Sequence, residues 1–166
     1  MAKIKKFSTV NIRKISGGKD PIRLVEEFIL RRGFDPEECR REAEPDSSRW
    51  MLHLGDDHGL GNEELEVLAE GIRKPSETTI YMGINVATVP VRGCQEVLAA
   101  ALEIADGLVG IKLSLVGHYL VLSASLGAAG ITVEDLDYNY KLITAQQTWF
   151  REALAEELSW ETIFES

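Results

Sequence analysis

The residues in this sequence that could bind a metal ion are concentrated in one short segment. His53, Asp56, Asp57 and His58 lie close together, and imidazole and carboxylate groups suit zinc or manganese. Two observations favour a structural role instead. The alternation of apolar residues predicts that His53 points away from its apolar neighbours, and Asp-Asp-His-Gly is ordinary turn chemistry. Because no distant ligand can be nominated, we predict that the protein binds neither a metal nor another cofactor.

The sequence also lacks the common motifs of catalytic sites. The phosphate-binding patterns GxxxxGK[ST] and GxGxxG are absent, and there is no GxSxG nucleophile elbow. Serine residues near His118 have no acidic residue at the right place to complete a triad. Cys94 begins an apolar helix face, which favours a packed thiol over a nucleophile. Since no general acid–base pair can be chosen from the scattered carboxylates, we predict that the protein is not an enzyme.

Charge is distributed unevenly along the chain. Residues 1–19 hold six basic side chains and no acidic one, whereas the remainder has 12 Lys and Arg against 27 Asp and Glu, a net charge of −15. An acidic body repels nucleic acid and anionic membranes and favours cationic partners. A basic arm of this kind can contact nucleic acid, but it is more often solvated or lies on its own acidic body. We therefore expect nucleic acid not to be the main partner.

The composition is that of an ordinary globular protein. Of the 166 residues, 45% are apolar and 27% are charged, which predicts one domain with a core of its own. Cys39 and Cys94 are too few for a disulfide framework and favour a reduced, cytoplasmic setting. Residues 7–15 alternate polar with apolar side chains, so we expect no secretion signal. Residues 107–131 are long enough to span a bilayer, but their period of two predicts a β-hairpin and no membrane helix.

Hydrophobic periodicity divides the body of the chain into helices and strands. The first helix is predicted to begin after Asp20, a suitable N-cap, with Pro21 in its first turn, and to end at Gly33. Polar and charged residues follow, with a short helical turn indicated at 35–38. The later elements are strands at 49–55, 64–72 and 78–89, a helix at 93–106, a hairpin at 109–126 and a helix at 132–158.

The second of these strands fits two patterns. Leu65, Leu68, Ala69 and Ile72 have helical spacing, and propensity favours a helix. Leu65, Val67 and Ala69 also alternate with glutamates, as in a half-buried strand. The spacing alone leaves the choice open.

The last helix is expected to be about 40 Å long. Thr132 and Asp135 have the spacing of a capping box, and the apolar residues form a heptad seam interrupted by one glutamine. This seam has more apolar surface than one sheet face covers, and tryptophans add aromatic surface near it. The partner-binding candidates are therefore Tyr140, Ile143, Gln147, Trp149, Phe150, Leu154 and Trp160. The alternative is that Trp149 and Phe150 simply pack on the sheet.

The element order α-β-β-β-α-β-β-α predicts an α+β fold, an antiparallel sheet of about five strands with helices packed on it. We expect a single domain at residues 20–158, preceded by the basic arm at 1–19 and followed by an acidic tail at 159–166.

This order resembles the type III secretion chaperone-like fold and its YbjN-type relatives. The features that carry the resemblance are a strand ending in Val89–Pro90, a short hairpin at 108–126, and an Ile-Thr-x-Glu-x-Leu entry to the last helix at 131–136. The resemblance covers roughly residues 21–158 and is architectural, since none of its features is a chemical motif. The sequence departs from it near the end of the middle helix. Relatives commonly have Asn there, whereas this chain has Glu103, Ile104, Ala105 and Asp106.

The resemblance implies a homodimer that offers apolar grooves to an unfolded or extended segment of another protein, and it favours a strand at 64–72. We accordingly expect a non-enzymatic, chaperone-like or regulatory protein-binding module. The alternative is a small-ligand-binding or enzymatic domain with a pocket between sheet and helices. Contact with nucleic acid through residues 3–19 is a third possibility, and it predicts binding that weakens steeply with salt.

Overall fold

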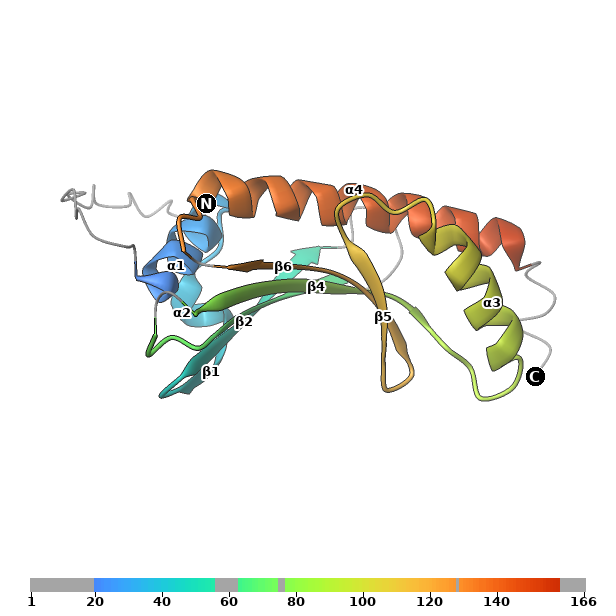
Figure 1. Cartoon of the computed structure of the whole chain (residues 1–166), viewed down its shortest axis with the longest axis horizontal. Helices are drawn as coiled ribbons and strands as arrows, with labels where there is room; N and C mark the ends of the chain where they lie inside the picture. Colours follow the sequence, from blue (N-terminus) through green and yellow to red (C-terminus); the bar gives the residue numbers. More distant parts are fainter. Residues whose placement is uncertain (1–19, 56–62, 75–76, 128, 159–166) are drawn as a thin grey trace, which may run out of the picture.

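The computed structural model describes residues 20–55, 63–74, 77–127 and 129–158, which form a six-stranded antiparallel sheet with helices on it (Figure 1). The elements are α1 (Pro21–Arg31), α2 (Pro36–Cys39), β1 (Arg40–Glu44), β2 (Ser47–Gly55), β3 (Glu63–Glu70), β4 (Thr79–Thr88), α3 (Cys94–Ala105), β5 (Lys112–Val116), β6 (Tyr119–Gly127) and α4 (Val133–Glu157). The predicted basic arm and acidic tail lie outside the described residues, as do Asp56, Asp57, His58 and Trp160.

The sheet confirms the predicted α+β fold class. Its strand order is β1-β2-β3-β4-β6-β5, and each neighbouring pair is antiparallel. The strand missing from the sequence prediction is β1, whose side chains are all at least partly exposed. Its sequence, Arg-Arg-Glu-Ala-Glu, has no buried face that could produce an alternating pattern. It forms because β2 supplies backbone partners along the edge of the sheet.

Residues 63–70 are a strand, as the resemblance favoured and helix propensity did not. In β3, Leu65, Val67 and Ala69 are fully buried on one face, and Glu64, Glu66 and Glu70 point to the other. The strand lies between β2 and β4 and bonds to both. Two flanking strands satisfy its backbone groups on both sides, which outweighs the modest helix propensity of Leu, Glu and Ala.

The two helices that cover the sheet, α1 and α4, begin as predicted. The Asp20 carboxylate accepts the Ile22 N–H at 3.1 Å, capping α1. At the start of α4, the Thr132 hydroxyl accepts the Asp135 N–H at 3.3 Å, and the Asp135 carboxylate accepts the Thr132 N–H at 2.8 Å. These reciprocal bonds form a capping box. The pKa of the Asp135 carboxyl is lowered because its charged form accepts from the Thr132 hydroxyl, at 2.7 Å, and from the Thr132 N–H.

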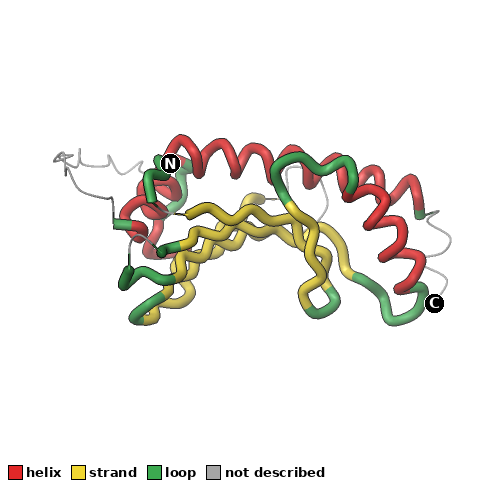
Figure 2. Tube along the Cα trace, in the orientation of Figure 1, coloured by secondary structure: helices red, strands yellow, loops and turns green. Residues whose placement is uncertain are grey.

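The core lies between the sheet and two helices. α1 and α4 pack on the same face of the sheet, and α3 packs on α4; Figure 2 shows the helices gathered on that side of the arched strands. Trp50, Phe28 and Phe150 are the largest fully buried side chains. No described helix covers the opposite face, which we call the open sheet face.

The segment expected to be a hairpin, residues 107–131, contains β5 and β6, joined by a tight turn at Gly117 and His118. Among the described residues, no helix has the length and apolar character needed to cross a membrane.

The middle helix α3 differs from its prediction in how its apolar residues are used. A single buried face was expected at Cys94, Val97, Leu98, Ala101, Leu102 and Ala105. Val97, Ala100 and Ala101 are buried, whereas Leu102 is 70% exposed and Cys94, Leu98 and Ala105 are only half-buried. The helix therefore has two apolar sides, and one of them faces outward.

Candidate functional site

Of the suspected metal cluster, the structure describes only His53. This side chain lies at the surface and pairs with Glu64 on the neighbouring strand. His53 Nδ1 lies 2.9 Å from Glu64 Oε1, and His53 Nε2 lies 3.3 Å from an Arg41 side-chain nitrogen. All three side chains are exposed to solvent or nearly so, so the contacts contribute little to stability. Among residues 20–55, 63–74, 77–127 and 129–158, no three His, Cys, Asp or Glu side chains are grouped as a metal site would require.

Cys39 does not have the surroundings of a reactive thiol. Both cysteines are free, Cys39 buried at the end of α2 and Cys94 half-buried at the start of α3. Burial raises the pKa of the Cys39 thiol, because the thiolate is disfavoured away from water. A nucleophilic cysteine needs the opposite shift.

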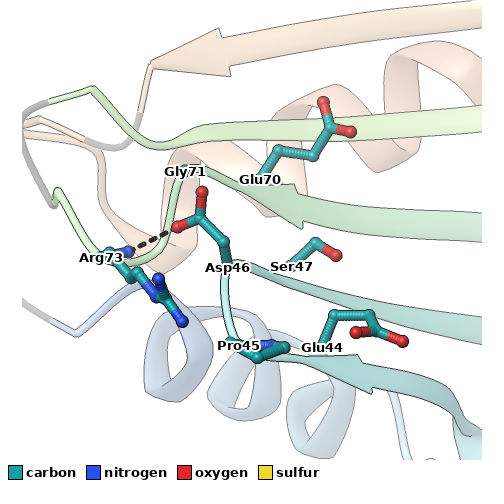
Figure 3. A pocket seen from close by; sticks show the side chains of 7 residues that line it. All are labelled: Glu44, Pro45, Asp46, Ser47, Glu70, Gly71 and Arg73. Atoms are coloured by element: carbon teal, nitrogen blue, oxygen red, sulfur yellow. Dashed lines mark hydrogen bonds between the residues drawn. The ribbon is translucent and has the colours of Figure 1, made fainter.

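A cleft of about 390 Å³ lies where the β1–β2 turn meets the end of β3. Figure 3 shows the residues that line it, which are Glu44, Pro45, Asp46, Ser47, Glu70, Gly71 and Arg73. The Asp46 carboxylate is occupied by the turn, since it accepts the Arg73 backbone N–H at 2.9 Å. The cleft is open to solvent, and three of its seven lining residues are acidic.

A second cleft tests the alternative of a ligand pocket between sheet and helices. It lies between the ends of β2 and β3 and the middle of α4, and its lining residues are Leu54, Gly55, Glu63, Tyr140, Thr144, Gln147 and Thr148. Its volume is about 150 Å³, below the roughly 300 Å³ at which ligand pockets usually begin. The cleft is therefore too small for an ordinary metabolite.

Arg151 closes the same region and fixes α4 to the sheet. Its guanidinium donates to the backbone oxygens of Asn85 and Val86, at 3.1 Å each, and pairs with Glu63. The two carbonyls lie at a bulge in β4, where the ladder with β6 is interrupted. Arg151 thus donates hydrogen bonds to strand carbonyls at a point where the ladder is irregular.

The six partner-binding candidates that the structure describes occupy three kinds of position. Four of them, Ile143, Gln147, Phe150 and Leu154, are buried between α4 and the sheet, and in this conformation they cannot contact a second protein. Tyr140 is half-buried, with Phe28 against its ring and the Arg32 guanidinium 5.0 Å from its centre. Trp149 is 41% exposed. Trp160 lies outside the described residues.

Trp149 lies beside the linker that joins α3 to β5, residues 106–111. Its ring packs on Gly107, where an added Cβ would be only 2.8 Å from the Trp149 Cη2 atom. One turn earlier on α4, the Gln146 carboxamide bonds to Val109 of the same linker. The exposed side of the C-terminal half of α4 is therefore continuous with the linker.

Exposed apolar side chains are concentrated around this linker. Of nine large apolar side chains exposed among the described residues, six lie between positions 91 and 119, and Trp149 packs against that stretch. We call this surface the α3–β5 face, which comprises Val91, Cys94, Leu98, Leu102, Val109, Leu115, Val116, Tyr119 and Trp149. In Figure 1, α3 and β5 flank the linker, which crosses α4 between them. Exposed apolar side chains in this number mark an interaction site. Leu115 and Val116 point to opposite faces of the sheet, so the surface wraps around the edge strand β5.

The sequence contains the signal for this surface, although the prediction did not use it. α3 is apolar on nearly all sides, and its few polar residues include Gln95, Glu96 and Glu103. A helix of that character is buried on all sides. Among the described residues of one copy, α3 is covered on one side only.

The open sheet face is a second surface free of helices. On it Arg49, Leu68 and Tyr81 form one cross-strand row, and Met51, Glu66, Gly83 and Ser123 form the next. Leu68, Met51 and Tyr81 are half-buried, and Glu64, Glu66 and Glu70 of β3 lie beside them. The face thus combines apolar side chains with carboxylates and with the Arg49 guanidinium, which pairs with Glu66 at 3.0 Å.

Comparison with known proteins identifies the fold. No protein-family model matches the chain, and no curated protein matches it by sequence. Among solved structures, a chain of the ExsC–ExsE complex matches with a TM-score of 0.53 and 16% identity, over 80% of this chain and 92% of that one. A chain of the HopA1–SchA chaperone–effector complex matches with a TM-score of 0.47 and 13% identity, over 78% and 91% of the two chains.

A third similar structure is the heterodimeric ExoU–SpcU complex from the type III secretion system of Pseudomonas aeruginosa, with a TM-score of 0.49 and 15% identity, over 80% of this chain and 98% of that one. The predicted type III secretion chaperone-like fold is confirmed. At 16% identity, the likeness establishes the fold and not the activity. A relation to the YbjN-type family stays a prediction.

Proposed function

We propose that the protein is a non-enzymatic binding module, which forms a homodimer through the α3–β5 face and holds a segment of another polypeptide. The observation that carries the proposal is the outward apolar side of α3, continued by the linker and the β5–β6 hairpin. A second copy of the chain is the occupant that best fits, because a two-fold axis brings the same apolar patch from both copies together.

The charge of the protein supports a self-contact at this face in particular. The chain carries a net charge of −9, so most of its surface repels a second copy. The exposed charged residues within 91–119 nearly balance, Arg92 and Lys112 against Glu96, Glu103 and Asp106, so two copies repel each other less there than over the rest of the chain. Tyr119 and Trp149 supply aromatic surface, which is enriched at interface cores.

The fold supports the binding of another protein. A chain with the same fold was solved in the ExsC–ExsE complex, which contains two different proteins. The clefts described above are too small or too open for substrate chemistry, whereas the open sheet face is broad and amphipathic. We propose that this face holds the partner segment, with apolar side chains on Met51, Leu68 and Tyr81 and basic ones near the glutamates of β3.

Sedimentation equilibrium tests the dimer. We expect a wild-type species of twice the 18.4 kDa chain mass and a monomer for Leu102→Glu, because each interface would then bury two carboxylates. Leu30→Glu is the matched control, since Leu30 is a 55% exposed leucine on α1, outside the face. A wild-type monomer at high concentration, or a Leu102→Glu variant that dimerises as the wild type does, would contradict the proposal.

A further inference from the structure

Gln146 holds the linker between α3 and β5 in the way that a neighbouring strand would. The Val109 N–H donates to Gln146 Oε1 at 2.9 Å, and Gln146 Nε2 donates to the Val109 carbonyl at 2.7 Å. A carboxamide has one acceptor and one donor group in the same arrangement as a peptide unit. The two bonds therefore reproduce the paired exchange found between hydrogen-bonded residues of an antiparallel ladder.

Two neighbours of Gln146 on the same side of α4 also contact the linker, and we call these three residues the linker clamp. Leu142, Gln146 and Trp149 are spaced four and three residues apart, so they line one side of the helix. The Trp149 ring packs on Gly107, and an added Cβ at Gly110 would lie 3.1 Å from Leu142. Glycine at these two positions lets the linker backbone lie directly against α4.

The clamp fixes the backbone at Val109 while leaving its side chain 70% exposed. A side chain that is apolar, exposed and held by both backbone groups is already in position to contact a partner. The linker also leads from α3 directly into β5, so its path sets how the two halves of the α3–β5 face lie relative to each other. A free linker would have to be ordered when two copies meet, at a cost in backbone entropy.

We propose that Gln146 is a positioning residue for the dimer, which sets the affinity between the two copies without itself supplying the apolar contact. The inference rests on the proposed homodimer and adds to it a specific determinant on α4. If Gln146 only stabilised the fold, its loss would lower the thermal stability of the monomer. Both hydrogen bonds are exposed to water, which can replace them in the monomer, so thermal unfolding of a monomeric variant should change little when they are lost.

The test compares dimer dissociation constants of the full chain by sedimentation. Gln146→Ala removes both bonds and should weaken the dimer by about tenfold, through the ordering cost of the freed linker. Thr148→Ala is the control, since Thr148 is exposed on α4 outside the clamp, and its dimer should match the wild type. Hydrogen exchange should show loss of protection at the Val109 amide in Gln146→Ala only.

Gln146→Glu adds a pH signature that a general loss of stability would not produce. The carboxylate can accept the Val109 N–H but has no proton to donate to the Val109 carbonyl. Relative to wild type at the same pH, this dimer should be weaker at neutral pH and recover as the carboxyl is protonated, near pH 4. A wild-type dimer that Gln146→Ala leaves unchanged, or that Thr148→Ala weakens equally, would overturn the positioning role alone. A wild-type monomer would overturn both this inference and the dimer.

Discussion

Tyr81 lies flat on the open sheet face, over a glycine in its own strand. An added Cβ at Gly83 would be 2.3 Å from the Tyr81 hydroxyl oxygen, so the absence of a side chain at Gly83 makes room for the ring. Burial raises the pKa of the Tyr81 phenol, and the nearby Ser123 hydroxyl opposes that effect only in part. The ring thus covers a part of the sheet that no described helix covers.

Substitution of the glycine should release this ring. In Gly83→Ala, the Tyr81 side chain must swing away from the strand, and its phenol should titrate near the ordinary value of about 10. A raised folded-state pKa gives stability that is present below about pH 10 and lost as the pH rises through the folded-state pKa, so the variant should lose less stability in alkali than the wild type. Tyrosinate absorbance, assigned with Tyr81→Phe, measures the shift; an unchanged titration in Gly83→Ala would show that the ring had not moved.

At the scale of elements, the attachment of α4 to β4 depends on one arginine. Arg151 bonds the carbonyls at the β4 bulge and pairs with Glu63, and both charged side chains are mostly buried. Because these groups satisfy one another, loss of the guanidinium leaves a shielded carboxylate and strand carbonyls without a partner.

We expect Arg151→Ala to lower the free energy of unfolding by about 2 kcal/mol, the size of losing a charged hydrogen-bond partner at a partly buried site. Arg23→Ala, at an exposed position on α1, should change it by less than about 0.5 kcal/mol. Urea denaturation of both variants provides the comparison. Equal unfolding free energies for the two would mean that the bulge contacts do not stabilise the domain.

The elements that the sequence predicts well are those with one buried face. α1, β2, β4 and α4 each have apolar residues at a clear period, and the structure has all four within a few residues of the predicted bounds. β1 has no such face, because an exposed edge strand is specified by its neighbour and not by its own side chains. β3 was ambiguous because its residues are good helix formers, and only the flanking strands decide its conformation.

For the candidate site, the assignment of partner-binding residues to α4 and Trp160 stays a prediction. A heptad seam on α4 indicates that apolar residues are covered, but not whether the sheet or a second protein covers them. The structure assigns that seam to the sheet and leaves Trp149 outside it. The linker clamp could not be predicted at all, since Gln146 and Val109 are 37 residues apart and meet only through the packing of α3 on α4.

At the scale of the whole molecule, the open sheet face and the acidic body together predict what kind of segment is bound. A partner segment should alternate apolar residues with Lys or Arg, matching half-buried Leu68 and Tyr81 beside the glutamates of β3. Peptides selected on the wild-type protein from a random library should have this composition and bind more weakly as salt is added.

Leu68→Ala should weaken the selected peptides several-fold through lost apolar contact, and Leu30→Ala should not, since Leu30 is exposed on α1. Fluorescence anisotropy of labelled peptides measures both affinities. Selected peptides that are acidic, or that bind the Leu68→Ala variant as tightly as the wild type, would place the partner elsewhere.

The central claim is that two copies of the chain meet at the α3–β5 face, and hydrogen exchange at two protein concentrations tests it most directly. Samples at protein concentrations above and below the dimer dissociation constant differ only in the fraction of the protein that is dimeric. The account predicts that protection gained at the higher concentration is confined to α3, the linker, β5 and the turn after it, residues 94–119, and to α4 around Trp149. Protection gained in α1 or β1 instead, or at no described residue, would contradict it.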